Sequence, residues 1–421
     1  MQLCIFEDQH FSNFFPLVYF RPVYALRCGG TKLREKIERL VPRAEVVYHA
    51  RPELADYLRE KSPGRAVNTL RDEPTWFVNG RVVANESLQR LLRSVPKGDV
   101  AYWHEGDVVA AYAGSRVAQQ WQEAVTGGPI TGDHFQTSPR EEIDVKLIRY
   151  PWELVHRNAD AIVADYSGRF KAKRPKAPQG KVYPGVSLVN RNNIVIGRGS
   201  VVKPQVVLDA ENGPIIIGES VTIYPHAFVE GPAYIGDGSV IKAGAKIYGG
   251  TTIGEVCKVG GEVEASIIHS YSNKQHEGFL GHSYLGSWVN IGADTNTSNL
   301  KNTYGTVEVS LNGERLDTGL QFVGLFMGDH SKTGINVMFD TGTLVGASCN
   351  VYGAGLPPKL LPSFSWGNIS SAFTAYRIEQ SIDTARKVMA RRNVPWTQAY
   401  ERLFRTVFEA TTGDRARQRI F

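Results

Sequence analysis

The chain contains 421 residues, which is enough for two or three domains. With 42% hydrophobic and 21% charged residues it has the composition of a soluble globular protein, and no apolar run approaches the roughly 20 residues of a membrane span. The net charge of +6 favours anionic ligands such as phosphates, but no basic run is interleaved with aromatic residues as single-stranded nucleic acid requires.

The cysteines and the N-terminal segment bear on the cellular compartment. Cys4, Cys28, Cys257 and Cys349 are scattered without CxxC spacing, which indicates buried thiols rather than a disulfide framework or a zinc site. The first residues include two acidic side chains and no apolar segment of the kind found in signal peptides. We therefore expect a cytoplasmic protein.

Residues 1–169 alternate between short apolar runs and amphipathic stretches. The pattern predicts strands at 2–7 and 44–50, strand-like runs on both sides of Asn79-Gly80 within 76–85, and two strands joined by a turn at Glu105-Gly106 within 99–114. It predicts helices with Thr31 as an N-cap, at Pro52 and near residue 87. Alternation of this kind is typical of a Rossmann-like α/β domain with a mostly parallel sheet.

A basic turn precedes the first of these helices. Gly29 and Gly30 lead into the helix N-terminus at Thr31, where backbone N–H groups attract a phosphate, and Arg21 and Arg27 add positive charge. At the carboxyl end of the first strand such a turn is placed to bind a nucleotide. The alternative is a glycine-containing turn whose basic side chains are merely solvated.

Residues 170–186 are rich in Lys, Pro and Gly and lack apolar periodicity, which indicates a linker. A repeat of six residues follows it. Aliphatic residues occupy the first place of ten hexads, at Ile196, Val202, Ile217, Ile223, Val229, Ile235, Ile241, Ile247, Ile253 and Val259. This period predicts a left-handed parallel β-helix over residues 187–366, in which three hexads form one coil and the aliphatic residues point inward. An Asn312-Gly313 hairpin is expected to project from it, and residues 367–421 are expected to be helical.

The repeat is interrupted between residues 273 and 302, and such interruptions often carry function. Six polar side chains gather there: Lys274, His276, His282, Asn290, Asn299 and Lys301. A histidine can take a proton from an attacking amine, as acyl transfer requires. The alternative is a histidine that only forms hydrogen bonds within a loop.

This run resembles the acyltransferase half of the bifunctional UDP-N-acetylglucosamine pyrophosphorylase/glucosamine-1-phosphate N-acetyltransferase family. His276 precedes an aromatic-Leu-Gly turn at 279–281, an Asn-Ile-Gly-Ala stretch begins at Asn290, and Asn299 follows it. The N-terminal half looks like a divergent sugar-nucleotidyltransferase subgroup, through the segments PLVYFRP, LRCGGTKLREK, VNGRVV and YPWELV.

The resemblance implies roles for individual residues. His276 would be the catalytic base, and Asn290 would contact the sugar phosphate, while Ala293 and Asn299 would lie near acetyl-CoA or the base. Lys274 and Lys301 would complete the set that binds acyl-CoA and the sugar phosphate. In the N-terminal domain, Asn79 would join the nucleotide-binding residues, and Asp165 or Asp160 would contribute to a Mg²⁺ site.

The resemblance also implies an activity. The β-helix would transfer an acetyl group from acetyl-CoA to an amino-sugar 1-phosphate, and the α/β domain would join a sugar 1-phosphate to a nucleoside triphosphate, with UTP the first choice. A homotrimer is implied as well. The chain departs from the family in lacking its glycine-rich nucleotide loop, in carrying Phe279 where tyrosine is usual and in placing Glu264 where a lysine is expected.

Two other functions are compatible with a β-helix. One is a trimeric scaffold or sensor without catalysis. The other is a zinc enzyme similar to the γ-class carbonic anhydrases, for which His269, His276, His282 and His330 would supply imidazoles.

Overall fold

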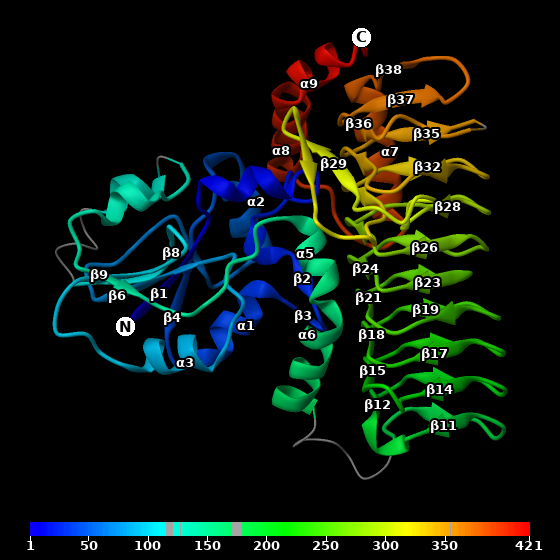
Figure 1. Ribbon diagram of the computed structural model, residues 1–421, viewed down its shortest axis with the longest axis horizontal. Coiled ribbons are helices and arrows are strands. Elements are labelled where there is room, and N and C mark those ends of the chain that lie inside the picture. The colour runs from blue at the N-terminus through cyan, green and yellow to red at the C-terminus, as the bar shows by residue number, and fades with distance from the viewer. Residues whose placement is uncertain (115–120, 127, 171–177, 354) are drawn as a thin grey trace.

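The computed structural model describes residues 1–114, 121–126, 128–170, 178–353 and 355–421. An α/β domain lies beside a tall column of stacked coils, and the C-terminal helices lie against one end of that column (Figure 1). The predicted fold class, an α/β domain followed by a left-handed parallel β-helix and C-terminal helices, is confirmed. The predicted linker falls in part on residues 171–177, which lie outside the described residues.

The α/β domain is built on one mixed sheet of seven strands. Its strands are β1 (Gln2–Phe6), β4 (Glu45–Tyr48), β5 (Ala66–Val67), β6 (Thr75–Asn79), β7 (Val100–His104), β8 (Asp107–Ala113) and β9 (Arg140–Glu142), in the order β5-β4-β1-β6-β8-β7-β9. Its helices include α1 (Leu33–Leu40), α2 (Pro52–Lys61), α3 (Glu86–Arg93), α5 (Pro151–His156) and α6 (Asn158–Asp165). Strands β5, β4, β1 and β6 are parallel, whereas β8 runs antiparallel to β6 and β7.

Two predicted element boundaries differ from the structure. Of the strand-like runs predicted on both sides of Asn79-Gly80, only the first forms a strand, β6, which ends at Asn79 because the Asn79 side chain accepts a hydrogen bond from the backbone N–H of Arg81 and turns the chain there. Helix α1 begins one residue later than predicted, with Lys32 as its N-cap. Thr31 instead donates its hydroxyl to Asp165 at the end of α6.

The β-helix has three parallel sheets, one for each side of the coil. The first contains β10 (Lys181–Val182), β13 (Val201–Val202), β16 (Thr222–Ile223), β19 (Val240–Ile241), β22 (Lys258–Val259) and β25 (Asn273–Lys274). This side continues with β32 (Lys332–Thr333), β35 (Asn350–Tyr352) and β37 (Ser365–Asn368), and β38 (Phe373–Ala375) is added antiparallel to β37. The second contains β11 (Ser187–Val189), β14 (Val207–Asp209), β17 (Phe228–Glu230), β20 (Lys246–Ile247), β23 (Glu262–Glu264) and β26 (Phe279–Gly281), and strand β28 (Asn296–Thr297) pairs with β33 (Met338–Phe339) further along the column.

The third sheet faces the α/β domain and has nine strands. They are β12 (Ile194–Ile196), β15 (Ile215–Ile217), β18 (Ala233–Ile235), β21 (Thr251–Ile253), β24 (Ile267–Ile268), β27 (Tyr284–Leu285), β31 (Phe326–Met327), β34 (Leu344–Val345) and β36 (Leu360–Leu361). The predicted hairpin consists of β29 (Glu308–Leu311) and β30 (Glu314–Asp317), with Asn312 and Gly313 in the left-handed region at its turn. The C-terminal helices are α7 (Ile378–Ala390), α8 (Gln398–Ala410) and α9 (Thr412–Arg417).

The hexad prediction is confirmed by the register of the coils. Ile223, Ile241 and Val259 are opposite one another in neighbouring strands of the first sheet. All ten first-place aliphatic residues are at most 3% exposed and belong to one core cluster. The coil is therefore stabilised by a continuous aliphatic column, as the six-residue period indicates.

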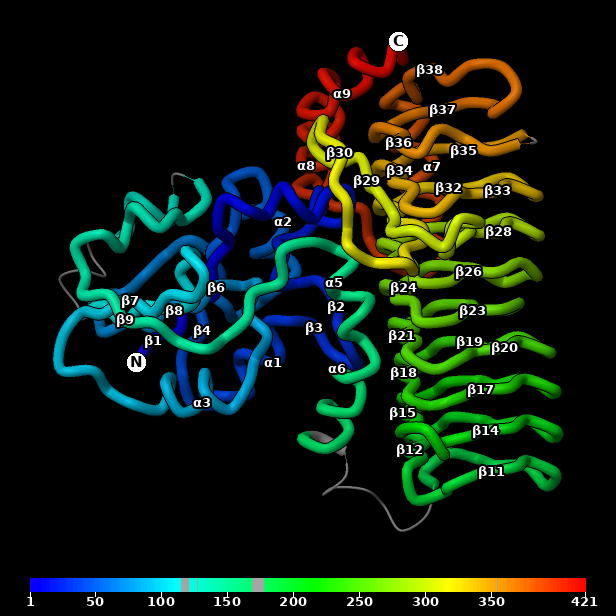
Figure 2. Tube along the Cα trace, viewed as in Figure 1, coloured from blue at the N-terminus to red at the C-terminus, as the bar shows by residue number. Residues whose placement is uncertain are grey.

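The outward side of the third sheet is apolar as well, and it binds the α/β domain. Ile216 and Tyr234 pack against Ile162 of α6, while Tyr284 and Phe326 pack among side chains of the N-terminal domain that include Trp152 of α5. Figure 2 shows α5 and α6 running along this side of the column. Since both faces of these strands are buried, the two domains share one continuous interior.

Tyr284 lies at the centre of this contact and provides a test of it. Its buried hydroxyl accepts a hydrogen bond from the backbone N–H of Arg27 at 2.8 Å and donates to the carbonyl of Arg27 at 3.1 Å. We expect Tyr284→Phe to lower the free energy of unfolding by about 1–3 kcal/mol, because two buried backbone groups lose their partner. Urea unfolding measures this, and Tyr352→Phe, at a residue 37% exposed, is the control, expected to stay within about 0.5 kcal/mol. Equal stabilities of the two variants would contradict a structural role for the Tyr284 hydroxyl.

Candidate functional site

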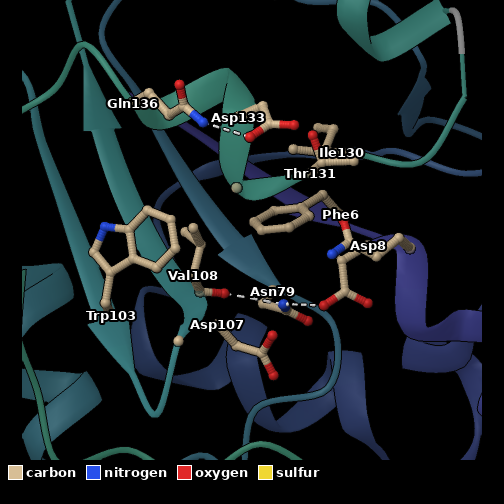
Figure 3. A pocket seen from close by; sticks show the side chains of 13 residues that line it. Phe6, Asp8, Asn79, Trp103, Asp107, Val108, Ile130, Thr131, Asp133 and Gln136 are labelled. Carbon is tan, nitrogen blue, oxygen red and sulfur yellow. Dashed lines mark hydrogen bonds between the residues drawn. The ribbon is translucent and has the colours of Figure 1, made fainter.

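A cavity of about 280 Å³ opens at the carboxyl ends of strands β1 and β6. It is lined by Phe6, Asp8, Gln9, Asn79, Trp103, Gly106, Asp107, Val108, Ile130, Thr131, Gly132, Asp133 and Gln136 (Figure 3). Ligands of open α/β sheets bind at this end of the strands. Of the nucleotide-binding residues predicted from the sequence, only Asn79 lines this cavity.

One buried arginine, Arg81, binds two carboxylates that line this cavity, Asp8 and Asp107. Arg81 donates from Nε to both carboxylate oxygens of Asp8 at 3.0 Å, and its Nη2 atom donates to both Asp8 and Asp107. Asn79 donates to Asp8 at 2.8 Å and to the carbonyl of Val108 at 3.0 Å. This network fixes the ends of β1, β6 and β8 relative to one another.

The opposite wall carries groups that remain available to a ligand. Asp133 accepts a hydrogen bond from Gln136 and forms no ion pair with any described residue, and Thr131 and the Trp103 ring lie nearby in the lining. None of the residues in this lining is basic. The cavity therefore suits a ligand with hydroxyl groups or a bound divalent cation better than a bare polyphosphate.

The basic turn predicted to bind phosphate lies elsewhere, in the interface between the domains. Arg21 forms a bidentate ion pair with Asp329 of the β-helix and donates to the Ser287 hydroxyl at 3.1 Å. Arg27 is 1% exposed and pairs with Glu255. Burial alone would raise the pKa of Glu255, but the Arg27 charge and a hydrogen bond from a serine hydroxyl lower it to about 2.

The glycine pair is also occupied by protein groups. The N–H of Gly29 donates to Asn158 at 2.7 Å and that of Gly30 donates to Asp165 at 3.0 Å. A Cβ atom on Gly30 would lie 2.7 Å from the Tyr234 ring, so glycine is required for this close approach. The expectation of an exposed phosphate-binding turn is thus not met, because its N–H groups and cations bind partners within the chain.

Asp165, expected to bind a metal, has its carboxylate enclosed. It accepts hydrogen bonds from Gly30 and Thr31. It also forms ion pairs with Lys36 at 2.6 Å and with Arg39 at 2.9 Å. Asp160 does not line the cavity at β1 and β6. Among the described residues, no group of three or more His, Cys, Asp and Glu side chains is arranged to hold a metal ion.

A second cavity, of about 290 Å³, lies on the β-helix at the interruption of the repeat. Its lining brings together three of the residues predicted for acyl transfer, His276, Asn290 and Ala293. Gln275, Ile291, Gly292, Thr333, Gly334 and Ile335 complete it. His276 is exposed, so its imidazole is accessible to a ligand. The backbone N–H of Ala293 makes no hydrogen bond with any described residue.

The other predicted residues of this region lie around the cavity rather than in its wall. Lys274 is 2% exposed and donates to the carbonyls of Gly260 at 3.1 Å and His276 at 2.8 Å, so it holds the loop that carries the histidine. Asn299 lies 3.0 Å from the imidazole of His282. Lys301 does not line this cavity.

The burial of Lys274 predicts a pH dependence of stability. Desolvation lowers the pKa of its ammonium group from 10.5 to about 8. Between pH 8 and 10.5 the folded protein therefore binds fewer protons at this position than the unfolded chain, and its free energy of unfolding rises with pH. We expect Lys274→Met to reduce this rise, measured by urea unfolding at about pH 7.5 and pH 10. Parallel pH profiles for the two proteins would contradict the assignment.

The four histidines considered for zinc do not converge. His269 is buried beside the Ala25 carbonyl and Ser287, and His330 is buried against Tyr400 of α8. The ring centroids of His282 and His156 are 5.5 Å apart, and of the four histidines only His276 lines the second cavity.

In the part of the chain that the structure describes, no helix combines the length and apolarity needed to cross a membrane.

Sequence reasoning missed Asp8, Asp107 and Asp133. Asp8 had a usable signal, because it follows the first apolar strand by two residues, and Asn79 likewise ends the first strand-like run of residues 76–85. Carboxyl ends of adjacent parallel strands meet at one edge of a sheet. Asp107 and Asp133 come from an antiparallel hairpin and a later turn, whose placement the strand pattern does not give.

Comparisons with known proteins agree with this two-part organisation. Residues 3–173 match a family model described as sugar nucleotidyl transferase, and residues 214–249 match one described as bacterial transferase hexapeptide. A curated relative from Sulfurisphaera tokodaii, named bifunctional sugar-1-phosphate nucleotidylyltransferase/acetyltransferase, is 36% identical over 104 residues, or 24% of this chain and 26% of its own. Another from Synechococcus elongatus, named bifunctional protein GlmU, is 28% identical over 217 residues, or 46% of this chain and 43% of its own.

These matches span less than half the length of either relative. Among solved structures, a UDP-N-acetylglucosamine acyltransferase from Bacteroides fragilis aligns over 55% of this chain and 96% of its own, at 14% identity and a TM-score of 0.21. The two family models thus match this chain in the order that the resemblance to the bifunctional nucleotidyltransferase/acetyltransferase family predicted, with sugar nucleotidyl transferase over residues 3–173 and bacterial transferase hexapeptide over residues 214–249.

Proposed function

We propose that this chain is an enzyme of sugar-nucleotide synthesis with two separate sites. The β-helix site transfers an acetyl group from acetyl-CoA to the amino group of a sugar 1-phosphate. The α/β site joins a sugar 1-phosphate to a nucleoside triphosphate, with UTP the first choice, and releases pyrophosphate. The observation that carries the proposal is the common cavity of His276, Asn290 and Ala293.

Acyl transfer needs a base and a group that stabilises negative charge. As the amine nitrogen bonds to the thioester carbon, the His276 imidazole accepts a proton from that nitrogen. The unpartnered N–H of Ala293 lines the same cavity and is suited to donate to the carbonyl oxygen as charge develops there. The C–S bond then breaks, and the proton held by His276 passes to the departing sulfur.

Nucleotidyl transfer is assigned to the cavity at β1 and β6. Mg²⁺ bound through one or two carboxylates and the substrate phosphates would neutralise charge during attack on the triphosphate. Asp133 fits this role better than Asp165, because the Asp165 carboxylate is enclosed by Lys36 and Arg39 while Asp133 has no cationic partner among the described residues. Asn79 and Asp8 position the floor of the cavity.

A homotrimer follows from the same proposal. The α/β domain covers the third sheet of the column, which leaves the other two sides, among them the second sheet, β11 to β26, for contact with other copies. Closed threefold symmetry suits a flat side of this kind, and the cavity at His276 borders it. Light scattering that shows a stable monomer at micromolar concentration would count against this part of the proposal.

An activity screen tests the proposal. The purified chain is incubated with a panel of sugar 1-phosphates, with acetyl-CoA and with each nucleoside triphosphate in the presence of Mg²⁺. We expect release of free thiol with amino sugars and release of pyrophosphate with at least one triphosphate. A scaffold without catalysis would release neither product.

A further inference from the structure

A third cavity, of about 260 Å³, lies where the end of helix α7 meets the first sheet of the β-helix. Its lining is Lys258, Tyr271, Asn273, Gln275, Trp288, Asn290, Lys332, Val388, Arg391 and Arg392. Four of these ten residues are cations and none is an acid. The composition differs from that of the cavity at β1 and β6, which contains acids and no cation.

The four cations come from two separate parts of the fold. Lys258 and Lys332 are on strands β22 and β32 of the β-helix, while Arg391 and Arg392 directly follow α7. No carboxylate in the described part of the chain forms an ion pair with any of them. Like charges gathered without a counter-charge repel one another, so the arrangement costs free energy unless an anion joins it.

Internal contacts hold these groups in place. Arg392 donates to the Asn273 side chain at 2.9 Å, and the Lys332 ammonium donates to the carbonyl of His330 at 2.7 Å. Burial lowers the pKa of Lys332 to about 8. Burial, together with the charges of Arg392, Lys242 and Arg391, also lowers the pKa of Lys258.

Attraction to the helix end explains only part of this cluster. Cations near the C-terminus of a helix are stabilised by the partial negative charge there, which accounts for Arg391 and Arg392 after α7. Lys258 and Lys332 belong to strands and gain nothing from this effect. An anionic ligand that contacts both the two lysines and the two arginines would account for all four cations.

We infer that this cavity binds a ligand with at least two phosphate groups, of the pyrophosphate type. Guanidinium and ammonium groups from two sides can each contact a different phosphate, and charge-assisted hydrogen bonds of this kind are stronger than neutral ones. The side-chain amides of Asn273, Gln275 and Asn290 supply further polar contacts. The half-buried Tyr271 ring, stacked on Trp288 at 4.3 Å, forms a flat wall suited to a base or a sugar ring.

Two sources supply such a ligand. Gln275 and Asn290 line both this cavity and the one that contains His276, so the two cavities adjoin. The diphosphate is therefore either the nucleotide end of a coenzyme A thioester whose acyl end reaches His276, or a free diphosphate that binds on its own. Both have the chemistry that the four cations select.

Titration calorimetry of the full chain with inorganic pyrophosphate, at fixed ionic strength and without acyl donor, tests the inference. The variant Lys258→Gln/Arg391→Gln removes one cation from each side at positions that are not fully buried. We expect its Kd for pyrophosphate to rise at least about tenfold. The control Arg198→Gln/Lys203→Gln removes the same net charge from the same column, outside the lining of this cavity, and should change Kd by less than about threefold.

Absence of pyrophosphate binding to the wild type at about 10 mM, or equal Kd values for the two variants, would overturn the inference. A second titration with coenzyme A distinguishes the sources. Competition between coenzyme A and pyrophosphate assigns the cavity to the nucleotide end of the donor, whereas simultaneous binding assigns it to a free diphosphate. Since pyrophosphate binding is measured without acyl donor or turnover, failure of the acyl-transfer proposal would not be mistaken for failure of this one.

Discussion

Replacing His276 with alanine should lower the kcat of acetyl transfer by about 10²–10⁴-fold and leave the protein folded. The imidazole is exposed and lines the cavity that also contains Asn290 and Ala293, so its loss removes the base without opening a void in the core. The free energy of unfolding should change by less than about 1 kcal/mol. Release of thiol from acetyl-CoA measures the rate.

His226→Ala is the matched control. His226 is also an exposed histidine on the β-helix, but it does not line the cavity. Nucleotidyl transfer should be equal in the wild type and both variants, because the other cavity belongs to the α/β domain. Equal acetyl-transfer rates for His276→Ala and His226→Ala would refute the assignment of the base.

Replacing Arg21 with alanine should lower the free energy of unfolding by about 3–5 kcal/mol. Its side chain is 11% exposed and that of its partner Asp329 is 3% exposed, so the variant leaves a buried carboxylate without its cation. Burial raises the pKa of Asp329, and Arg21 opposes that effect in the wild type. Without Arg21, the pKa of the Asp329 carboxyl is higher in the folded state than in the unfolded chain. The loss of stability should therefore grow as pH rises above the ordinary pKa range for aspartate.

Two further variants test this explanation by urea unfolding. In Arg21→Ala/Asp329→Asn the buried charge is gone, and much of the stability should return. Arg198→Ala, which breaks an exposed ion pair with Glu219, should cost no more than about 1 kcal/mol. If Arg21→Ala were as stable as Arg198→Ala, the ion pair between the domains would not contribute more to the free energy of unfolding than an exposed ion pair does.

The repeat of the β-helix and the position of the loop that contains His276 were predictable because each depends on local sequence. A period of six places each aliphatic residue on the inside of a coil, wherever the coil lies in the molecule. Residues 273–302 interrupt that period, and the structure brings His276, Asn290 and Ala293 of this stretch to one cavity. His276 and Asn290 stood out as polar groups of this stretch, whereas Ala293 was expected there only from the resemblance to the acetyltransferase family.

The contact between the domains was not predictable in this way. Ile216 and Tyr234 occupy the second place of three-residue strands, where an outward side chain can face solvent, another copy or another domain. Arg21 and Arg27 carry the charge that phosphate binding needs, but their carboxylate partners are about 230 to 310 positions away in the chain. A motif shows which groups are present, and only the tertiary structure shows that Asp329 and Glu255 already bind them.

The most direct measurement of the central claim uses one reaction mixture. The purified chain is given an amino-sugar 1-phosphate, acetyl-CoA, UTP and Mg²⁺, and the products are identified by mass spectrometry. The account predicts a nucleoside diphosphate sugar that carries the acetyl group, together with free coenzyme A and pyrophosphate. It also predicts that His276→Ala forms acetylated product at least about 100-fold more slowly while pyrophosphate release persists. Formation of neither product with any amino-sugar 1-phosphate or triphosphate tested would contradict it.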